Sequence, residues 1–218
     1  MALSEDGQLG AARAKIERSV AANPNNAHGA HGFAHVWYES GELDMARTYL
    51  FSWLSTYPRE GFFYGHLSWH LSLCEIQAGN WAQALRLYHD AIALDRHSGG
   101  PQQKISDGAA FLWRSELAGH PRDAAAWRAL YRYANSALSR PSSGLADLHV
   151  ILAQAVIGDD AAPDAGLVKS RSWRKMGITL LALTFPRWRG LRGVRTQGFF
   201  GRDRGACAAR GAKRTHWR

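Results

Sequence analysis

The amino-acid sequence predicts an all-α fold built from a stack of antiparallel helical hairpins. Three observations lead to this prediction. A glycine ends an apolar helical run at Gly7, Gly41 and Gly79, and these glycines are 34 and 38 residues apart. Pro24 and Pro58 follow the intervening helices, again 34 residues apart. Finally, no segment alternates apolar and polar residues in the manner of a half-buried strand.

The period and its punctuation indicate tetratricopeptide-like repeats, in which about 34 residues form one helix–turn–helix unit. Glycine suits the left-handed end of a helix, and proline stops the helix before it. Each copy also opens with a large apolar residue followed three positions later by alanine, which lets neighbouring helices approach closely: Leu9 and Ala12, Leu43 and Ala46, Trp81 and Ala84. We therefore expect a right-handed α-α superhelix.

Glycine, proline and short polar stretches separate the individual helices. Residues 95–104 are predicted to be a loop, with Ser106 or Asp107 capping the helix that follows. The segment before Gly7 is expected to be the last turn of a further helix, so that the first hairpin lacks its opening helix. The expected helices span residues 9–22, 27–40, 42–57, 62–78, 81–94, 106–118, 122–138 and 145–157.

Charge divides the chain near residue 165. Residues 166–218 contain 14 Lys and Arg and one acid, Asp203, whereas residues 1–165 contain 13 basic and 17 acidic residues. The formal net charge of +9 therefore comes from the tail. We expect a helical-repeat region over residues 1–165 and a basic Arg/Gly/Trp-rich, unstructured tail over residues 166–218.

The tail has two interpretations. The one we favour is translation in a shifted frame, because GC-rich codons for alanine-rich helices encode Arg, Gly and Trp out of frame. The chain would then be a truncated fragment of a longer protein. The other is a genuine basic extension, which would bind nucleic acid through phosphate contacts and stacking. Nucleic acid is expected as a partner only in this second case.

The remaining composition argues against a secreted or membrane-spanning protein. Cys74 and Cys207 cannot form a disulfide framework, and the N-terminus lacks the pattern of a signal peptide. The longest apolar run, residues 178–185, is far shorter than the about 20 residues of a spanning helix. We expect a cytoplasmic protein without a membrane partner.

Four stretches carry a resemblance to a known family. They are residues 25–36 (NNAHGAHGFAHV), 65–71 (GHLSWHL), 105–114 (ISDGAAFLWR) and 146–149 (ADLH). In this order they resemble the tetratricopeptide repeat protein 38 family, over about residues 5–165. The resemblance implies a helical-repeat protein without an assigned reaction, of which this chain would supply a middle portion. Trp37 departs from the family, which often has another histidine there.

Histidine is the one residue type that suggests chemistry. Six histidines fall in the family-like stretches: His28, His31, His35, His66, His70 and His149. His31 and His35 are four residues apart on one expected helix, and His66 and His70 are four apart on another, so each pair lies on one helix face. A pair at this spacing can chelate zinc or another divalent metal, with Glu39 and Glu75 as the nearest acids in sequence. No HExxH or CxxC pattern accompanies them. Packing histidines, residues that contact a partner and a metal or acid–base site all stay open.

The function predicted from these observations is a scaffold that holds a protein or peptide on its concave face. Helices 27–40, 62–78 and 106–118 would form that face, in an extended or helix-in-groove mode. Besides the histidines, its groove residues would be Tyr64, Trp69, Trp113 and Arg114. The alternative is a metal-dependent protein or enzyme that uses the histidines; no catalytic residue can be assigned. Open ends of the stack would favour self-association.

Overall fold

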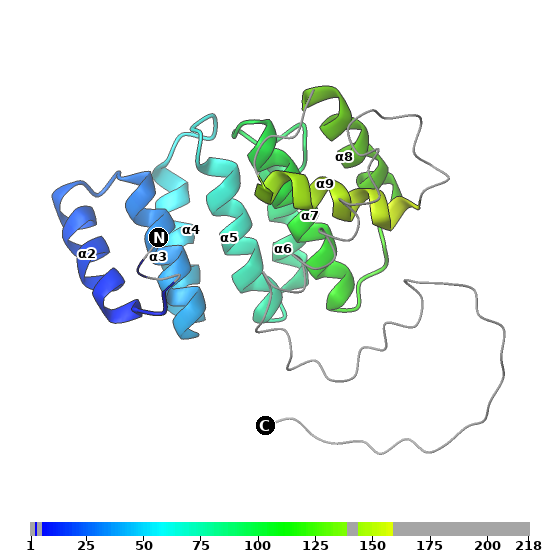
Figure 1. Ribbon diagram of the computed structural model, residues 1–218. Helices are drawn as coiled ribbons and strands as arrows, with labels where there is room; N and C mark the ends of the chain where they lie inside the picture. The colour runs from blue at the N-terminus through cyan, green and yellow to red at the C-terminus, as the bar shows by residue number, and fades with distance from the viewer. Residues whose placement is uncertain (1–2, 4–5, 139–143, 159–218) are drawn as a thin grey trace, which may run out of the picture.

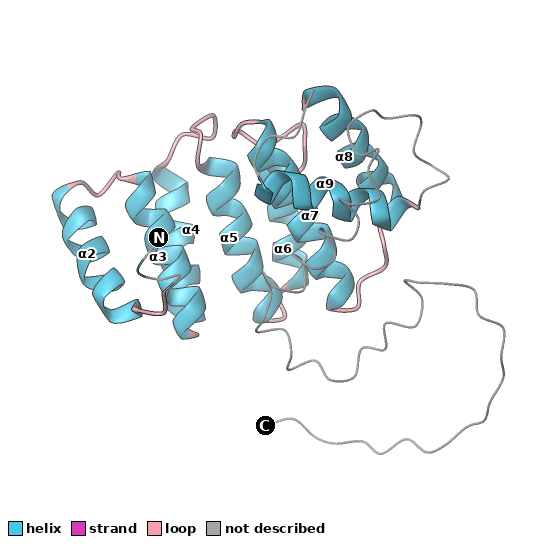
Figure 2. Cartoon of the chain, viewed as in Figure 1, coloured by secondary structure: helices cyan, strands magenta, loops and turns pink. Residues whose placement is uncertain are grey.

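The computed structural model describes residues 3, 6–138 and 144–158. Over these residues the chain forms helices joined by loops, and no strand occurs among them (Figures 1 and 2). The all-α fold class is therefore confirmed. The predictions for the tail, residues 166–218, lie outside the described residues.

The helices pack in two layers. The segments are α2 (Leu9–Ala22), α3 (Ala27–Ser40), α4 (Leu43–Thr56), α5 (Tyr64–Gln77), α6 (Trp81–Leu87), η1 (Tyr88–Ile92), α7 (Pro101–Leu117), α8 (Ala124–Ala137) and α9 (Gly144–Ile157). Each packs against its neighbours along the chain, and α3, α5, α7 and α9 also pack against one another in that order (Figure 1). We call these four helices the inner layer. The arrangement is compatible with a helical-hairpin solenoid, whose handedness stays a prediction.

The same helix ending recurs along the chain. Gly41, Gly79 and Gly119 have φ angles of 79°, 77° and 96°, in the left-handed region that glycine adopts at little cost. After each glycine, a backbone N–H donates to the carbonyl five residues back: Glu42 to Trp37, Asn80 to Glu75 and His120 to Ser115. Gly7 has a φ of 78°, and the N–H of Gln8 after it donates to the carbonyl of Leu3 in the same way. These bonds satisfy carbonyls that a helix end would otherwise leave unpaired.

Two segments differ from the sequence-based expectation by more than two residues at one end. α7 begins at Pro101, so residues 101–104 are helical and the predicted loop is shorter. Proline starts this helix because its missing N–H is not needed in the first turn and its fixed φ suits the helix. Ser106 and Asp107 lie inside α7 and are buried, so the prediction that one of them caps the helix was wrong.

The second difference is in the outer helix of the third hairpin. Residues 81–94 were expected to form one α-helix, but α6 ends at Leu87 and the π-helical segment η1 follows. The N–H of Ala93 donates to the carbonyl of Tyr88, five residues back, at 2.8 Å. The Tyr88 ring stacks on Phe111 of α7 with the ring centroids 4.5 Å apart, which fixes η1 against the inner layer.

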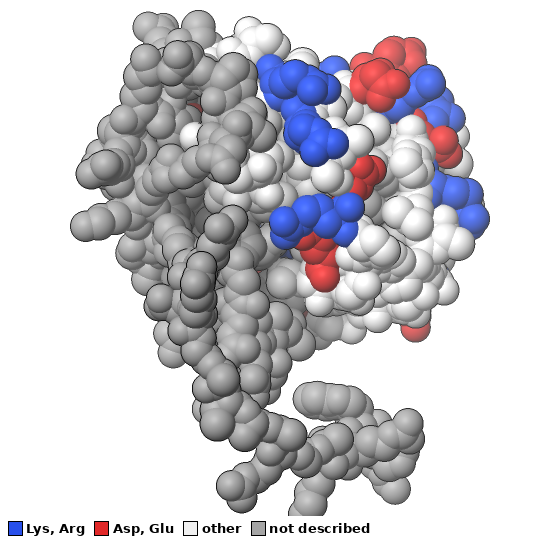
Figure 3. All heavy atoms as spheres, turned by 90° about the vertical axis from the view of Figure 1, so that its right-hand side faces the viewer, with Lys and Arg blue, Asp and Glu red and all other residues white. Residues whose placement is uncertain are grey.

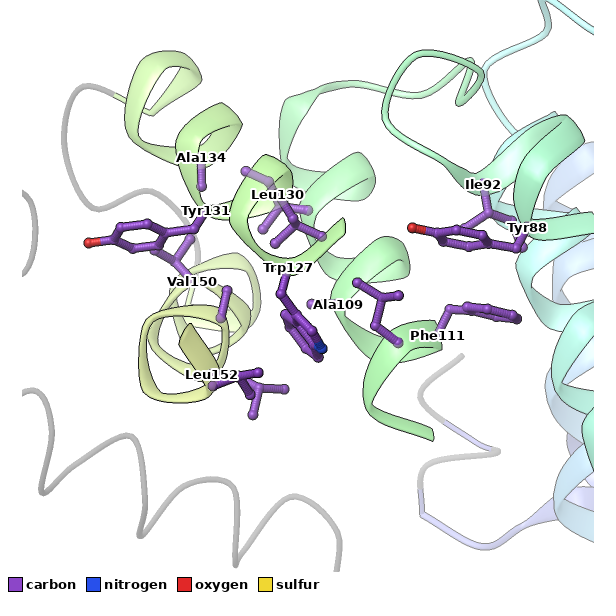
Figure 4. Packing of buried hydrophobic residues seen from close by; sticks show 14 of the residues in the cluster. Tyr88, Ile92, Ala109, Phe111, Trp127, Leu130, Tyr131, Ala134, Val150 and Leu152 are labelled. Carbon is purple, nitrogen blue, oxygen red and sulfur yellow. The ribbon is translucent and has the colours of Figure 1, made fainter. Parts of the chain in front are cut away.

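The largest apolar cluster joins η1, α7, α8 and α9. Trp127 of α8 is fully buried in the same apolar cluster as Ala109 of α7 and Leu152 of α9 (Figure 4). Its indole N–H donates to the Glu116 carboxylate at 2.6 Å, so the polar atom of this buried ring is satisfied. Trp37 and Trp53 are also buried, as expected for aromatic residues that fill a hairpin stack.

On the face of the molecule that Figure 3 shows, charged side chains of both signs occur. In the view of Figure 3, Lys and Arg side chains lie beside Asp and Glu side chains and do not merge into one patch. Within the described ranges, no helix has the length and apolar character needed to cross a membrane.

Candidate functional site

The first helices of two successive hairpins bring four histidine rings together. His31 and His35 are one turn apart on α3, and His66 and His70 are one turn apart on α5. The His31 ring centroid lies 4.6 Å from that of His35, 4.6 Å from that of His66 and 4.9 Å from that of His70. The His35 and His66 rings lie 4.6 and 4.8 Å from His70. We call these four residues the histidine cluster.

Three Nε2 atoms of the cluster meet at His31. Nε2 of His31 lies 3.0 Å from Nε2 of His35 and 2.9 Å from Nε2 of His66. A hydrogen bond needs a proton on one nitrogen and a lone pair on the other, and each neutral imidazole has one of each. The proton arrangement of one ring is therefore coupled to that of the next.

Asp107 of α7 anchors the cluster from a third helix. Nδ1 of His66 donates to the Asp107 carboxylate, 2.8 Å from Oδ2 and 3.0 Å from Oδ1. A neutral His66 that donates through Nδ1 must accept at Nε2, so the proton between His31 and His66 then belongs to His31. Asp107 is 3% exposed, so these hydrogen bonds take the place of the ones that water would otherwise make to its carboxylate.

His97 is the second partner of Asp107 and was missed by the sequence-based reasoning. Its Nε2 donates to Oδ2 of Asp107 at 2.9 Å, and its Nδ1 accepts from the backbone N–H of Gly99 at 2.9 Å. This pair of bonds fixes the tautomer with the proton on Nε2. The ring lies directly against α5, because an added Cβ at Gly65 would come within 2.7 Å of Nδ1 of His97. The His97 ring can lie this close to α5 because residue 65 has no side chain.

His70 lies at the buried end of the cluster. Its side chain is 5% exposed, and within the described part of the chain its Nε2 has no hydrogen-bond partner. The Trp69 ring lies 4.7 Å from the His70 ring and stacks on His66 with the centroids 5.5 Å apart. A buried polar nitrogen without a hydrogen-bond partner lowers the stability of the fold by about 1–3 kcal/mol.

Burial keeps three of the imidazoles neutral. It lowers the pKa of His31 to about 3, with the neighbouring His66 and His35 acting in the same direction. Burial and then His66 lower the pKa of His35 to about 4, and burial lowers the pKa of His70 well below its usual value. Burial alone would raise the pKa of Asp107, but the hydrogen bonds from His66 and His97 outweigh it and the pKa lies below its ordinary value.

Two of the six predicted histidines lie apart from this cluster. His28 is exposed, and its ring packs edge-on against Phe63 with the centroids 4.7 Å apart. His149 is buried in α9, where its Nδ1 bonds the Leu145 carbonyl at 2.8 Å. Glu75, expected as a nearby acid, accepts two bonds from Arg47 at 3.0 and 3.1 Å. The acid of the cluster is Asp107, which is distant in sequence.

The predicted groove residues separate into two groups. Arg114 of α7 lies above the Trp69 ring, with its guanidinium carbon 5.6 Å from the centroid. Tyr64, at the start of α5, packs against the apolar cluster of α3, α4 and α5, with Arg59 5.4 Å from its ring centroid. Trp113 packs against the large apolar cluster. Trp69 packs against the same large cluster. Trp69 and Arg114 therefore lie together next to the histidine cluster, and the role of all four residues in a groove stays a prediction.

The cluster contains a set of nitrogens that could hold a metal ion. One ligand atom each from His31, His35 and His70 lies within 4.8 Å of the other two. No protein-family model matches the chain, and no solved structure matches it. The family suggested by the four sequence stretches therefore stays a prediction.

Proposed function

We propose that the chain is a helical-repeat scaffold of the tetratricopeptide kind that binds a protein or peptide segment on the surface of α3, α5 and α7. The scaffold part of this proposal is supported by the packing of successive helical hairpins, with the inner layer formed by the first helix of each. Such layers present side chains from several helices to one extended ligand.

The observation that carries the proposal is the contact between Arg114 and Trp69. A guanidinium above an indole face is a favourable cation–π arrangement, and it joins α7 to α5 at a half-buried position. Tyr38 of α3 extends the same surface: burial raises its pKa, and the Arg114 charge acts in the opposite direction. Gln77 donates to the Tyr38 hydroxyl at 3.3 Å. Side chains from three inner-layer helices thus form one aromatic and cationic surface.

This chemistry favours a particular kind of peptide. Guanidinium donors recognise carboxylates through paired hydrogen bonds, and aromatic rings provide apolar contact area at a small entropy cost. The proposed ligand is a segment with an acidic group next to an aromatic or aliphatic anchor. The family resemblance implies nothing more specific.

Selection from a random peptide library tests the proposal. The full-length chain is used as bait, and enriched peptides are measured by calorimetry against the parent chain and against R114Q. We expect enriched peptides to combine an acidic residue with an apolar one, and R114Q to bind them about tenfold or more weakly, since a hydrogen bond to a charged group contributes about 1.5–3 kcal/mol. The matched control is R128Q, which removes an exposed arginine on α8.

Two results would overturn the proposal. One is the absence of any enriched peptide family. The other is an equal loss of affinity in R114Q and R128Q, since the binding would then depend on overall charge and not on the surface of α3, α5 and α7.

A further inference from the structure

The geometry points to a zinc-binding site formed by the imidazole nitrogens of His31, His35 and His70. This site goes beyond partner binding and does not depend on it. The three side chains come from α3 and α5, and their ligand atoms already lie within 4.8 Å of one another. Zinc with Zn–N distances of about 2.0–2.1 Å places tetrahedral nitrogens about 3.3 Å apart. Zinc binding would therefore draw the three nitrogens closer together than the 4.8 Å limit within which they now lie.

Proton counting supports a cation at this position. With neutral rings, His66 donates to Asp107 and accepts from His31, so the only Nε2 proton of His31 is committed. Nε2 of His35, 3.0 Å from the same atom, then has to face it with a lone pair. More lone pairs than protons meet at this point. A metal ion accepts several lone pairs at once, and a bond from it to Nε2 of His31 requires the proton of that nitrogen to move to Nδ1 of the same ring.

His70 provides the second, independent observation. Its Nε2 is buried and has no hydrogen-bond partner among the described residues, and His70 is one of the three residues that could hold an ion. A metal bond would satisfy this nitrogen.

The surroundings resemble those of histidine metal sites. Ligating imidazoles are commonly oriented by carboxylates, and a neighbouring anion balances the ion's charge. The Asp107 carboxylate acts on His31 electrostatically and holds Nδ1 of His66 at 2.8 Å. Nε2 of His66 consequently lies 2.9 Å from Nε2 of His31, one of the three proposed ligand residues. Zinc fits this set because it is bound by neutral imidazole and needs no sulfur ligand.

Calorimetric titration of the chelator-stripped, full-length chain with zinc sulfate tests the site. The background chain contains C207S and H216A, so that neither Cys207 nor His216 can contribute a ligand. We expect one zinc per chain, and affinity reduced by about 100-fold or more in H35Q and in H70Q, because each lacks one of three ligands. The matched control H28Q changes an exposed histidine on the same helix and should bind as the parent does.

H70Q alters a buried position and could fail to fold, so H35Q at a half-buried position is the deciding variant, with helix content checked by circular dichroism. Cobalt(II) offers a second readout, since a tetrahedral nitrogen site gives a strong visible absorption that should be present in H28Q and absent in H35Q. Absence of saturable zinc binding in the parent, or equal affinity in H35Q and H28Q, would overturn the proposal.

Discussion

Nδ1 of His66 donates to Oδ2 of Asp107 across 2.8 Å, and this bond joins α5 to α7 inside the inner layer. The same carboxylate also accepts from His97, so one buried acid holds two histidines that come from different segments. A buried carboxylate with two such donors is a point at which a single substitution should have a large effect.

Replacing Asp107 by asparagine should destabilise the fold. The amide matches the carboxylate in shape, but it has one acceptor oxygen, and its NH₂ group faces donor hydrogens. We expect the free energy of unfolding to fall by about 2 kcal/mol or more, measured by urea denaturation of the metal-free chain. The control D95N changes an exposed acid and should alter it by less than about 0.5 kcal/mol. Equal values for the two variants would contradict the anchoring role of Asp107.

Acidification should destabilise the metal-free chain through the histidine cluster. His31 and His35 have folded-state pKa values of about 3 and 4, below the unfolded value of 6.5, so the unfolded chain binds more protons in this window. Stability is therefore retained above pH 6.5 and falls as pH decreases towards 4 and then 3. Each neutral imidazole contributes a slope of about 1.4 kcal/mol per pH unit.

Urea denaturation between pH 4 and 7, with a chelator present, measures this dependence. H35Q removes one titrating ring and should have a smaller slope, whereas H28Q, outside the cluster, should match the parent. Because the pKa of Asp107 is lowered in the folded chain, its carboxylate becomes protonated only at more acidic pH, and the stability that it contributes is lost there. A slope that is identical in all three proteins would show that the cluster does not determine the acid sensitivity.

Gly65→Ala should be harmful, whereas the equivalent change in another helix should not. An added Cβ at Gly65 would lie 2.7 Å from the His97 ring, which is held by bonds at both nitrogens and cannot easily move. We expect a loss of about 1–3 kcal/mol. Gly10 also occupies the second position of its helix, and a Cβ there meets nothing within 4 Å. G10A should stabilise the fold by about 0.5–1 kcal/mol, and thermal unfolding compares the two variants.

Leu50 and Phe51 provide a neighbouring pair with opposite expectations. Leu50 is 0% exposed within the apolar cluster of α3, α4 and α5, whereas the Phe51 side chain is 66% exposed. L50A should lower the free energy of unfolding by about 2–5 kcal/mol, and F51A should change it by less than about 0.5 kcal/mol. The two results together would check the predicted orientation of α4, because a rotated helix would reverse the order.

The sequence predicts the helices well because glycine, proline and apolar spacing act locally. Gly41 and Gly79 end α3 and α5 at the expected places, and the two histidine pairs meet because their separation of 35 residues is close to one repeat. Asp107 and His97 were not predicted as site residues, because their roles depend on contacts across 41 and 10 positions and on an open space at Gly65. Local patterns contain no signal for such contacts. Pro101 was wrongly placed in the predicted loop, because proline occurs both after the end of a helix and at the start of one.

The sharing of one carboxylate among three segments has a consequence for local opening of the chain. Separating α7 from α5 would break the bond between His66 and Asp107, so these two helices should open together. In hydrogen exchange, the amides in the middle of α5 and α7 should therefore be protected by a similar free energy. The amides of α2, which packs mainly on α3, should exchange from a smaller, separate opening.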